Sequence, residues 1–163
     1  TGEIIHAANR GEKLTVIFVN NAIYGMTNGQ MAPTTLLSQR TETTPLGRDV
    51  ERDGYPIRIT EMLKVLPGVK FLARTAVHTP QDIMKTKNAI KDAFEVQINN
   101  LGFSLVEVLS MCPTCWRVSP RDALDWVKNN MIPYYPLGRI KEPEEDSTEI
   151  KGPQKRQQKK KIF

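Results

Sequence analysis

The chain has 163 residues, of which 39% are apolar, 25% charged and 7% aromatic, and its formal net charge is +5. The apolar content excludes an intrinsically disordered protein, and no apolar run approaches the roughly 18 residues of a membrane helix, so we expect one modest soluble domain, or part of a larger one, with no membrane contact. Six positive charges lie in residues 151–163, which contain no acid. The remainder is therefore slightly acidic, and we expect no nucleic-acid partner.

A short helix and a strand are predicted at the start of the sequence. Apolar Ile4, Ile5 and Ala8 recur at helical spacing, and the pattern stops at Gly11. Residues 14–19 form an almost continuous apolar and β-branched run, which is typical of a strand covered on both faces in a parallel sheet. The polar segment 20–30 follows this strand directly.

Strands and helices alternate along the rest of the chain. The Thr-, Pro- and Gly-rich segment 31–56 has little periodicity and is interpreted as a long loop that is functional or packs on a partner. The alternation predicts an α/β fold with a parallel sheet flanked by helices. After the loop we expect helices at 58–66, 79–101 and 119–131, strands at 69–77 and 103–109, and a charged, flexible tail at 139–163.

The two later helices begin with clear capping signals. Thr79-Pro80 and Ser119-Pro120 each place a cap residue before a proline at the first helical position. The large apolar residues of the first of these helices recur about every four residues and predict its buried face. They are Ile83, Ile90, Phe94, Ile98 and Leu101.

The polar segment after the first strand is the best candidate for a binding site, because ligands of doubly wound sheets bind at the carboxyl ends of the strands. Asn20 and Asn21 offer amide oxygens that suit a hard cation, and Gly25 and Gly29 allow backbone N–H groups to approach an anion. The segment contains no carboxylate, so the pattern favours a diphosphate with Mg²⁺ over a bare metal ion. The spacing alone also fits an ordinary polar turn.

A resemblance to a known family changes that balance. The string from Val16 to Thr35, VIFVNNAIYGMTNGQMAPTT, closely resembles the thiamine diphosphate-binding segment of the β subunits of 2-oxoacid:ferredoxin oxidoreductases, whose pattern reads NN-x-IYGMTGGQ-x-SPTT. The resemblance continues through 54–58, 102–110 and 130–138. It implies that residues 1–138 are the C-terminal part of a thiamine diphosphate-binding domain.

The resemblance also implies ligands for the cofactor. Asn21 would bind Mg²⁺ through its side-chain oxygen and Ile23 through its carbonyl, and Met26 and Asn28 would face a bound 2-oxoacid. Asn28 departs from the second glycine of the family pattern, which bears on substrate choice more than on cofactor binding. The implied cofactor-binding residues are Asn21, Ile23, Gly25, Met26, Thr27, Gly29 and Gln30.

Other parts of the family's machinery are absent from this sequence. Family β subunits carry, ahead of the corresponding helix, a Gly-Asp-Gly motif whose aspartate binds Mg²⁺, and cysteines that hold an iron–sulfur cluster. We therefore interpret the sequence as an N-terminally truncated β subunit that would not bind the cofactor tightly alone. No catalytic residue is assigned, because the family's activating glutamate belongs to the partner α-type subunit.

The complete enzyme implied by the resemblance would decarboxylate a 2-oxoacid, transfer the acyl group to coenzyme A and reduce ferredoxin. Two other functions remain open: half of a non-oxidative thiamine diphosphate decarboxylase, and a non-catalytic assembly subunit with the same fold. The sequence does not identify the 2-oxoacid, since one methylene in a pocket changes binding by only about 1–3 kcal/mol.

The chain has two cysteines, Cys112 and Cys115, which lie within Cys-Pro-Thr-Cys-Trp. Two cysteines are too few for a disulfide scaffold or a zinc site. Residues 1–6 show no secretory signal, so we expect a protein of the reducing cytoplasm. The next helix signal lies at Ser119, so the sequence does not place Cys112 at a helix N-terminus, where a thioredoxin-like thiol would lie. Structural packing is favoured over a redox or cluster role. The corresponding family pattern is CPT-x-W, in which the second cysteine is often replaced.

The histidines and the large aromatic residues give no further site. His6 and His78 have no neighbouring carboxylate or serine in the sequence that would form a relay, so ordinary polar or capping roles are favoured. The aromatic residues are expected in the core or at a subunit interface. They are Trp116, Trp126, Tyr134 and Tyr135.

Overall fold

A four-stranded sheet in the order β1-β3-β2-β4 forms the centre of residues 2–143, the part of the chain that the computed structural model describes. β1 and β2 both run parallel to β3, whereas β4 lies at the edge and runs antiparallel to β2. This mainly parallel order confirms the predicted α/β class. The strands are β1 (Thr15–Asn20), β2 (Val69–Ala76), β3 (Phe103–Leu109) and β4 (Gly138–Lys141).

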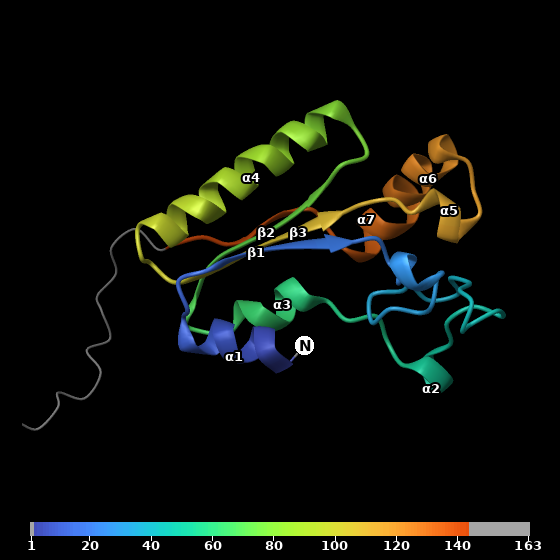
Figure 1. The fold of residues 1–163 in the computed structure, drawn as a ribbon, viewed down its shortest axis with the longest axis horizontal. Coiled ribbons are helices and arrows are strands. Elements are labelled where there is room, and N and C mark those ends of the chain that lie inside the picture. Colours follow the sequence, from blue (N-terminus) through green and yellow to red (C-terminus); the bar gives the residue numbers. More distant parts are fainter. Residues whose placement is uncertain (1, 144–163) are drawn as a thin grey trace, which may run out of the picture.

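Helices cover both faces of this sheet. In Figure 1, the long helix α4 lies on one face, and α1 and α3 lie on the other. Shorter helices gather beyond the carboxyl ends of β1 and β3. Within residues 2–143, no helix has the length and apolar character needed to cross a bilayer. The helical segments are α1 (Gly2–Arg10), η1 (Gly25–Thr27), α2 (Val50–Asp53), α3 (Ile59–Lys64), α4 (Pro80–Ile98), α5 (Pro113–Trp116), α6 (Pro120–Trp126), η2 (Val127–Met131) and α7 (Ile132–Tyr134).

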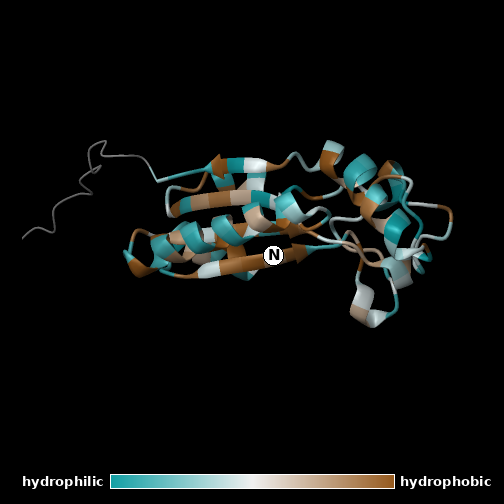
Figure 2. Ribbon diagram, turned by 90° about the horizontal axis from the view of Figure 1, so that it is seen from above, coloured by the Kyte–Doolittle hydropathy of each residue, from teal (hydrophilic) through white to brown (hydrophobic). Residues whose placement is uncertain are grey.

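The central strands β2 and β3 supply most of the core. Successive side chains of a strand point to opposite faces. Leu72 and Leu105 therefore pack with α1 and α3, while Phe71 and Val106 pack with α4. Burial of one such side chain stabilises the fold by about 1.5–3 kcal/mol, and Figure 2 shows hydrophobic residues concentrated along the strands. The carboxyl edge of the sheet is thus a firm base for the polar turn that follows β1.

Helix α4 begins where the capping signal predicts, but it buries a different face. The Thr79 hydroxyl accepts the Asp82 backbone N–H at 3.1 Å, and Pro80 opens the helix. The face predicted to be buried is mostly wrong: Ile90 packs against the core, but the other four residues are exposed, Ile98 by 74%. They are Ile83, Phe94, Ile98 and Leu101. Small side chains let the helix approach the sheet closely, and this approach, rather than the spacing of large residues, selects the buried face. The residues on it are Thr86, Ala89, Ala93 and Val96.

Strand β1 forms as predicted, but the expectation that it is covered on both faces is wrong. Ile17 is 39% exposed and Val19 59% exposed. Among the described residues β1 pairs only with β3, so it is an edge strand of the described sheet. A β-branched run predicts the extended backbone correctly, but it does not report how many neighbours the strand has.

The last described residues differ from the prediction. The helix expected over 119–131 begins at the Ser119 cap as predicted, whose hydroxyl accepts the Asp122 N–H at 3.2 Å, but it loosens into the π-helical turn η2 and continues as α7. The tail predicted from residue 139 is wrong for its first residues, because β4 pairs Arg139 and Lys141 with β2. Residues 144–163, the rest of that tail, lie outside the described residues.

The long loop of residues 31–56 is organised around one buried side chain. Arg48 is 6% exposed, and its guanidinium donates to six backbone carbonyls at 2.7–3.3 Å. One arginine therefore satisfies carbonyls that a loop without regular structure would leave unpaired. The acceptors are the carbonyls of Ala32, Pro33, Thr35, Asp53, Gly54 and Tyr55.

Candidate functional site

Residues 20–30 form a closed turn at the carboxyl end of β1, which we call the β1 turn. The backbone N–H of Tyr24 donates to the Gln30 carbonyl at 3.0 Å, and the Gly29 N–H donates to the Tyr24 carbonyl at 2.9 Å. The 3-10 segment η1 forms the tip of the turn. All the residues predicted to bind the cofactor therefore lie in one compact structure.

The base of the β1 turn is fixed by Asn20 and by an unusual backbone at Ala22. Asn20 is buried, and its side-chain oxygen accepts the Ala22 N–H at 3.0 Å. Ala22 has φ of +55°, a conformation that costs energy for a residue with a side chain. Its carbonyl is held by the Thr35 hydroxyl at 2.7 Å and the Gln39 amide at 3.1 Å. The long loop thus supports this strained residue between Asn21 and Ile23.

Asn21 and Ile23 present the two oxygens predicted to bind a metal ion. The Asn21 side-chain oxygen accepts the Ile23 N–H at 3.3 Å, and the Ile23 carbonyl accepts the Gly25 N–H at 3.1 Å. Both oxygens are neutral ligands of the kind that hard cations take. Nowhere in residues 2–143 do three or more His, Cys, Asp or Glu residues gather to hold a metal ion. The turn therefore fits Mg²⁺ that also has anionic ligands from a diphosphate or another carboxylate.

A cavity of about 360 Å³ lies beside the β1 turn. Asn20, Asn21 and Ile23 line it together with apolar residues of β1, α1 and α3. A concave, mainly apolar space with a few polar groups is the usual form of a cofactor site. The two predicted metal ligands therefore border a space that can admit a small molecule.

Gly25 and Gly29 shape the turn itself. Their own N–H groups bond to the Ile23 and Tyr24 carbonyls within the turn, and their predicted place beside the diphosphate stays a prediction. Gly29 has φ of +91°, which favours glycine. A Cβ at Gly25 would lie 3.0 Å from Cys112 Sγ, so that side chain would have to shift to admit it. Both glycines serve the shape and packing of the turn.

The remaining predicted residues lie at the exposed tip. Met26 is fully exposed, and the Thr27 hydroxyl donates to the Gln30 side-chain oxygen and to the Tyr24 carbonyl. Asn28 ends η1 with φ of +76°. Asparagine adopts this backbone more readily than other residues with side chains, so the observed conformation suits both Asn28 and the glycine of the family pattern.

A buried polar network beneath the β1 turn was not predicted from the sequence. The Asn20 amide donates to Glu107 at 2.7 Å, and Arg74 Nε donates to the other Glu107 oxygen at 2.7 Å. Arg74 also donates to both oxygens of Glu61, at 2.8 and 2.5 Å. Arg74 and Glu107 are fully buried and face each other across β2 and β3. This network orients Asn20, and through it the start of the turn.

One signal in the sequence could have revealed this network. Glu107 is the only charged residue in the apolar strand 103–109, and Arg74 interrupts the neighbouring predicted strand. A charge on a strand buried on both faces needs a partner, since an unpaired buried charge is very costly. Two such charges of opposite sign on consecutive predicted strands are therefore candidates for a cross-strand pair, because strands that follow each other in sequence often lie side by side.

The network shifts the pKa of two groups around it. Burial by itself would raise the pKa of Glu61, but the hydrogen bonds from Arg74 and Thr60 outweigh it and lower that pKa to about 2. Burial also raises the pKa of Tyr135, and the nearby Glu107 adds to this rise. The Tyr135 hydroxyl therefore stays protonated and donates to the Thr34 carbonyl at 2.8 Å.

The two cysteines lie against the β1 turn. Cys112 is the N-cap of the four-residue helix α5, so the prediction that no helix begins there is wrong. Both thiols are free and half-buried, and Cys115 Sγ donates to the Gly25 carbonyl at 3.4 Å. Packing against the candidate site is thus one role of this segment, as the sequence favoured.

The remaining candidates from the sequence have simple surroundings. His6 is exposed on α1. His78 Nδ1 lies 3.5 Å from Asp82 Oδ2, so the statement that it has no neighbouring carboxylate is wrong. Trp116 and Trp126 are tilted against each other with ring centroids 4.4 Å apart. Both are partly buried and pack against the core cluster that contains Val127 and Met131, which agrees with the expectation of a core or interface position.

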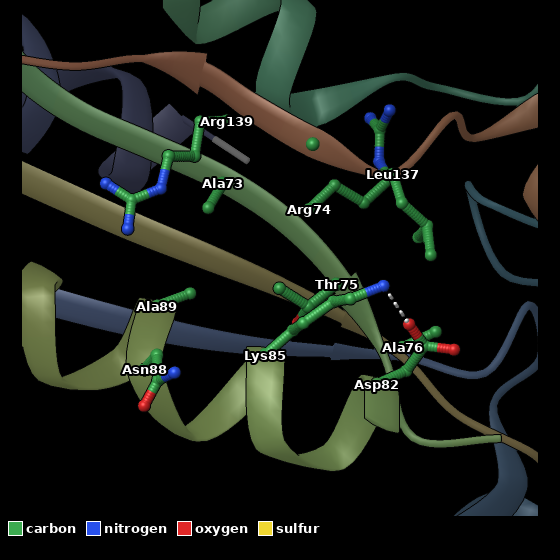
Figure 3. Close-up of a pocket in the computed structure, with 11 residues that line it drawn as sticks. Ala73, Arg74, Thr75, Ala76, Asp82, Lys85, Asn88, Ala89, Leu137 and Arg139 are labelled. Carbon is green, nitrogen blue, oxygen red and sulfur yellow. Dashed lines mark hydrogen bonds and ion pairs between the residues drawn. The ribbon is translucent and has the colours of Figure 1, made fainter. Parts of the chain in front are cut away.

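A second cavity, of about 350 Å³, lies between α4 and the strands β2 and β4. Figure 3 shows Lys85 and Asp82 paired at one side of it, with Arg139 at the other. Arg139 is paired with Asp92 and Glu142. None of the predicted site residues lines this cavity, so the cavity beside the β1 turn is the better candidate site.

Comparison with known proteins identifies the class of domain. Residues 1–108 match the family described as thiamine pyrophosphate enzyme, C-terminal TPP binding domain. The match covers most of the chain and the whole β1 turn, and the chain therefore belongs to this family.

More specific relatives agree with the resemblance read from the sequence. The chain is 45% identical over 140 residues to ketoisovalerate oxidoreductase subunit VorA of Methanothermobacter marburgensis, covering 86% of this chain and 29% of that protein. It is 41% identical over 126 residues to 2-oxoglutarate synthase subunit KorB of Archaeoglobus fulgidus, covering 77% and 43%. It is 34% identical over 113 residues to 2-oxoacid:ferredoxin oxidoreductase subunit beta of Saccharolobus solfataricus, covering 69% and 33%. The chain thus spans less than half the length of each of these relatives.

A solved structure supports the fold. The 2-oxoglutarate:ferredoxin oxidoreductase from Magnetococcus marinus, with 2-oxoglutarate, coenzyme A and succinyl-CoA bound, matches 90% of this chain and 53% of its own chain with a TM-score of 0.60. The sequence identity is 20%. At this identity the likeness concerns the fold alone. Together with the family match over residues 1–108, it confirms the predicted fold class.

Proposed function

We propose that this chain is part of the thiamine diphosphate-binding β subunit of a 2-oxoacid:ferredoxin oxidoreductase. Residues 1–138 then correspond to the C-terminal part of the cofactor-binding domain. One observation carries the proposal: Asn21 and Ile23 present two neutral oxygens on a braced turn that borders a cavity of about 360 Å³, in a chain of the thiamine pyrophosphate enzyme family.

In this proposal, the chain binds the cofactor through the β1 turn. The Asn21 side-chain oxygen and the Ile23 carbonyl bind Mg²⁺, and the turn from Gly25 to Gln30 borders the diphosphate and the reactive ring. Met26 and Asn28, at the exposed tip, face the 2-oxoacid. The bound cofactor supplies the nucleophilic carbon and the electron sink for decarboxylation, while the protein positions it and excludes side reactions.

In this proposal, groups outside the β1 turn complete the charge of the site, since no carboxylate lines the cavity beside the turn within the described residues. Two neutral oxygens do not balance the charge of Mg²⁺. The diphosphate and a further carboxylate would balance it, and the family's Gly-Asp-Gly motif would provide that carboxylate. The iron–sulfur cluster of the complete enzyme likewise has no family ligands in this chain. An α-type subunit, ferredoxin and coenzyme A complete the proposed reaction.

The names of the relatives support this reaction without identifying the acid. One relative is named for ketoisovalerate and another for 2-oxoglutarate, and the solved structure has 2-oxoglutarate and coenzyme A bound. All three act on 2-oxoacids by name. The proposal therefore names the class of substrate, a 2-oxoacid, and does not specify which 2-oxoacid it is.

The test uses the intact native assembly that contains this chain, because the site needs ligands from other segments. Isothermal titration with thiamine diphosphate and Mg²⁺ compares the native protein with Asn21→Ala and with Asn88→Ala, a matched change on the exposed surface of α4. We expect Asn21→Ala to weaken cofactor binding at least tenfold, since loss of a metal ligand removes a direct contact. Equal affinities for all three proteins would contradict the proposal.

Product analysis on the same assembly separates the alternative functions. Acceptor reduction with acyl-CoA formation supports the oxidoreductase. Release of an aldehyde without reduction of any acceptor would indicate a non-oxidative decarboxylase. Native assembly that binds no cofactor at all would indicate a structural subunit.

A further inference from the structure

The two cysteines of the chain are placed to react with each other. The Cys112 carbonyl accepts the Trp116 N–H at 3.0 Å, so Cys112 and Cys115 occupy positions i and i+3 of one helical turn. Residues three apart on a helical turn are neighbours on one face, and the Cys112 and Cys115 thiols are in hydrogen-bond contact with each other. Both thiols are free and only half-buried, so small reagents can reach them.

The side chains of Cys112 and Cys115 pack against the β1 turn at Gly25, and that of Cys115 also packs at Gly29. Cys115 Sγ donates to the Gly25 carbonyl at 3.4 Å. A Cβ at Gly25 would lie 3.0 Å from Cys112 Sγ and 3.9 Å from Cys115 Sγ, and one at Gly29 would lie 3.4 Å from the Cys115 Cβ. A chemical change at either sulfur atom therefore alters the contacts of the β1 turn.

We propose that Cys112 and Cys115 are a redox-active pair that forms a reversible disulfide with low-molecular-weight disulfides, and that this disulfide weakens cofactor binding at the β1 turn. The first part concerns these two residues alone. The second part rests on the proposed function.

The reaction is two successive thiol–disulfide exchanges. The Cys112 thiolate attacks one sulfur of RS–SR and displaces RS⁻, and the Cys115 thiolate then attacks Cys112 and displaces the second RS⁻. The protein loses two electrons and two protons, and RS–SR becomes two RSH. Burial, with the contact to Cys112, raises the pKa of the Cys115 thiol, which disfavours Cys115 as the first nucleophile.

Oxidation removes a donor from the β1 turn. A disulfide sulfur has no hydrogen, so the Gly25 carbonyl loses its hydrogen bond from Cys115. One hydrogen bond changes an equilibrium by up to about tenfold. Because linkage is reciprocal, bound cofactor favours the dithiol by the same factor. A tenfold preference raises the midpoint potential of this two-electron couple by about 30 mV.

The experiment equilibrates the intact native assembly, without oxygen, in buffers of defined glutathione and glutathione disulfide, with and without thiamine diphosphate and Mg²⁺. Alkylation and peptide mass spectrometry then measure the fraction of the Cys112–Cys115 peptide that has lost two hydrogen atoms. We expect one two-electron transition, with a midpoint about 30 mV higher when the cofactor is present.

Two variants of Cys115 form a matched pair. Cys115→Ser keeps a donor for the Gly25 carbonyl, whereas Cys115→Ala removes it. We expect Cys115→Ser to bind the cofactor like the reduced native protein in every buffer, and Cys115→Ala to bind it like the oxidised protein. A variant effect due only to misfolding would affect both.

The outcomes separate the two parts of the proposal. If only mixed disulfides with glutathione form, the redox-active pair is excluded. If the disulfide forms and calorimetry shows cofactor binding, but the midpoint does not move, the coupling is excluded. If calorimetry shows no cofactor binding, the proposed function fails, and the titration without cofactor still decides whether the pair is redox-active.

Discussion

Left-handed backbone conformations at single residues give the β1 turn its shape. Ala22 has φ of +55° and is held by Thr35 and Gln39, while Asn28 has φ of +76° at the end of η1. Strained residues of this kind persist only where their surroundings hold them, and they concentrate at functional sites. Their presence on both sides of Ile23 and Gly25 agrees with a turn built to hold its oxygens in fixed places.

Asn28 offers a direct test of this conformation. We expect Asn28→Gly to keep the thermal stability of the protein within about 0.5 kcal/mol, because glycine adopts positive φ freely. Asn28→Val should destabilise it by about 1–2 kcal/mol, because a β-branched side chain resists that backbone. Thermal unfolding measures both changes, and equal destabilisation by Gly and Val would show that the conformation is not the reason for Asn28.

Arg48 provides the second test at the residue scale. We expect Arg48→Lys to destabilise the protein by about 3 kcal/mol and to expose the loop 31–56 to proteolysis. An ammonium group cannot reach the six carbonyls that the planar guanidinium serves, and several would remain buried without a donor.

Arg40→Lys is the matched control for this change, because Arg40 is an exposed arginine of the same loop. It should alter neither stability nor cleavage. Similar cleavage patterns in the two variants would mean that Arg48 does not organise the loop.

At the scale of elements, local signals in the sequence predict where helices and strands begin. The caps at Thr79 and Ser119 are confirmed, and so are β1, β2 and β3. Local signals do not predict contacts between elements. The buried face of α4 depends on how closely it approaches the sheet, and β4 forms because β2 offers an edge to pair with. The candidate site residues were predicted from the resemblance to a family and not from local signals. The buried pair of Arg74 and Glu107 was not predicted, because it depends on the register between strands that are far apart in the sequence.

The ion pair between α3 and β2 gives a pH-dependent prediction. The pKa of Glu61 in the folded protein is about 2, below the ordinary 4.5. A lowered carboxyl pKa contributes stability that is present above the unfolded pKa and is lost as the pH falls toward the folded pKa. We therefore expect the native protein to lose its advantage over Glu61→Gln between about pH 5 and pH 2.

Denaturant unfolding at several pH values across this range measures the difference between the two proteins. Glu51→Gln, on the exposed surface of α2, serves as the control and should show no such convergence. A difference between native protein and Glu61→Gln that stays constant with pH would refute the role of the Arg74–Glu61 pair.

At the scale of the whole molecule, the described residues hold the β1 turn firmly but supply only part of the proposed cofactor site. The sheet, the buried network and the Arg48 loop all hold the β1 turn from beneath, while its tip at Met26 is exposed. The chain spans 29–43% of the length of the three curated relatives compared above, and the described residues that line the cavity beside the β1 turn include no carboxylate. Under the proposed function, other segments and subunits complete this site at the exposed tip.

The most direct measurement of the central claim is an experimental structure of the intact assembly with thiamine diphosphate and Mg²⁺ bound. We predict that the Asn21 side-chain oxygen and the Ile23 carbonyl lie about 2.0–2.1 Å from the Mg²⁺ ion, with the diphosphate beside η1. A cofactor bound away from the β1 turn, or a turn filled by side chains of another segment, would contradict the account.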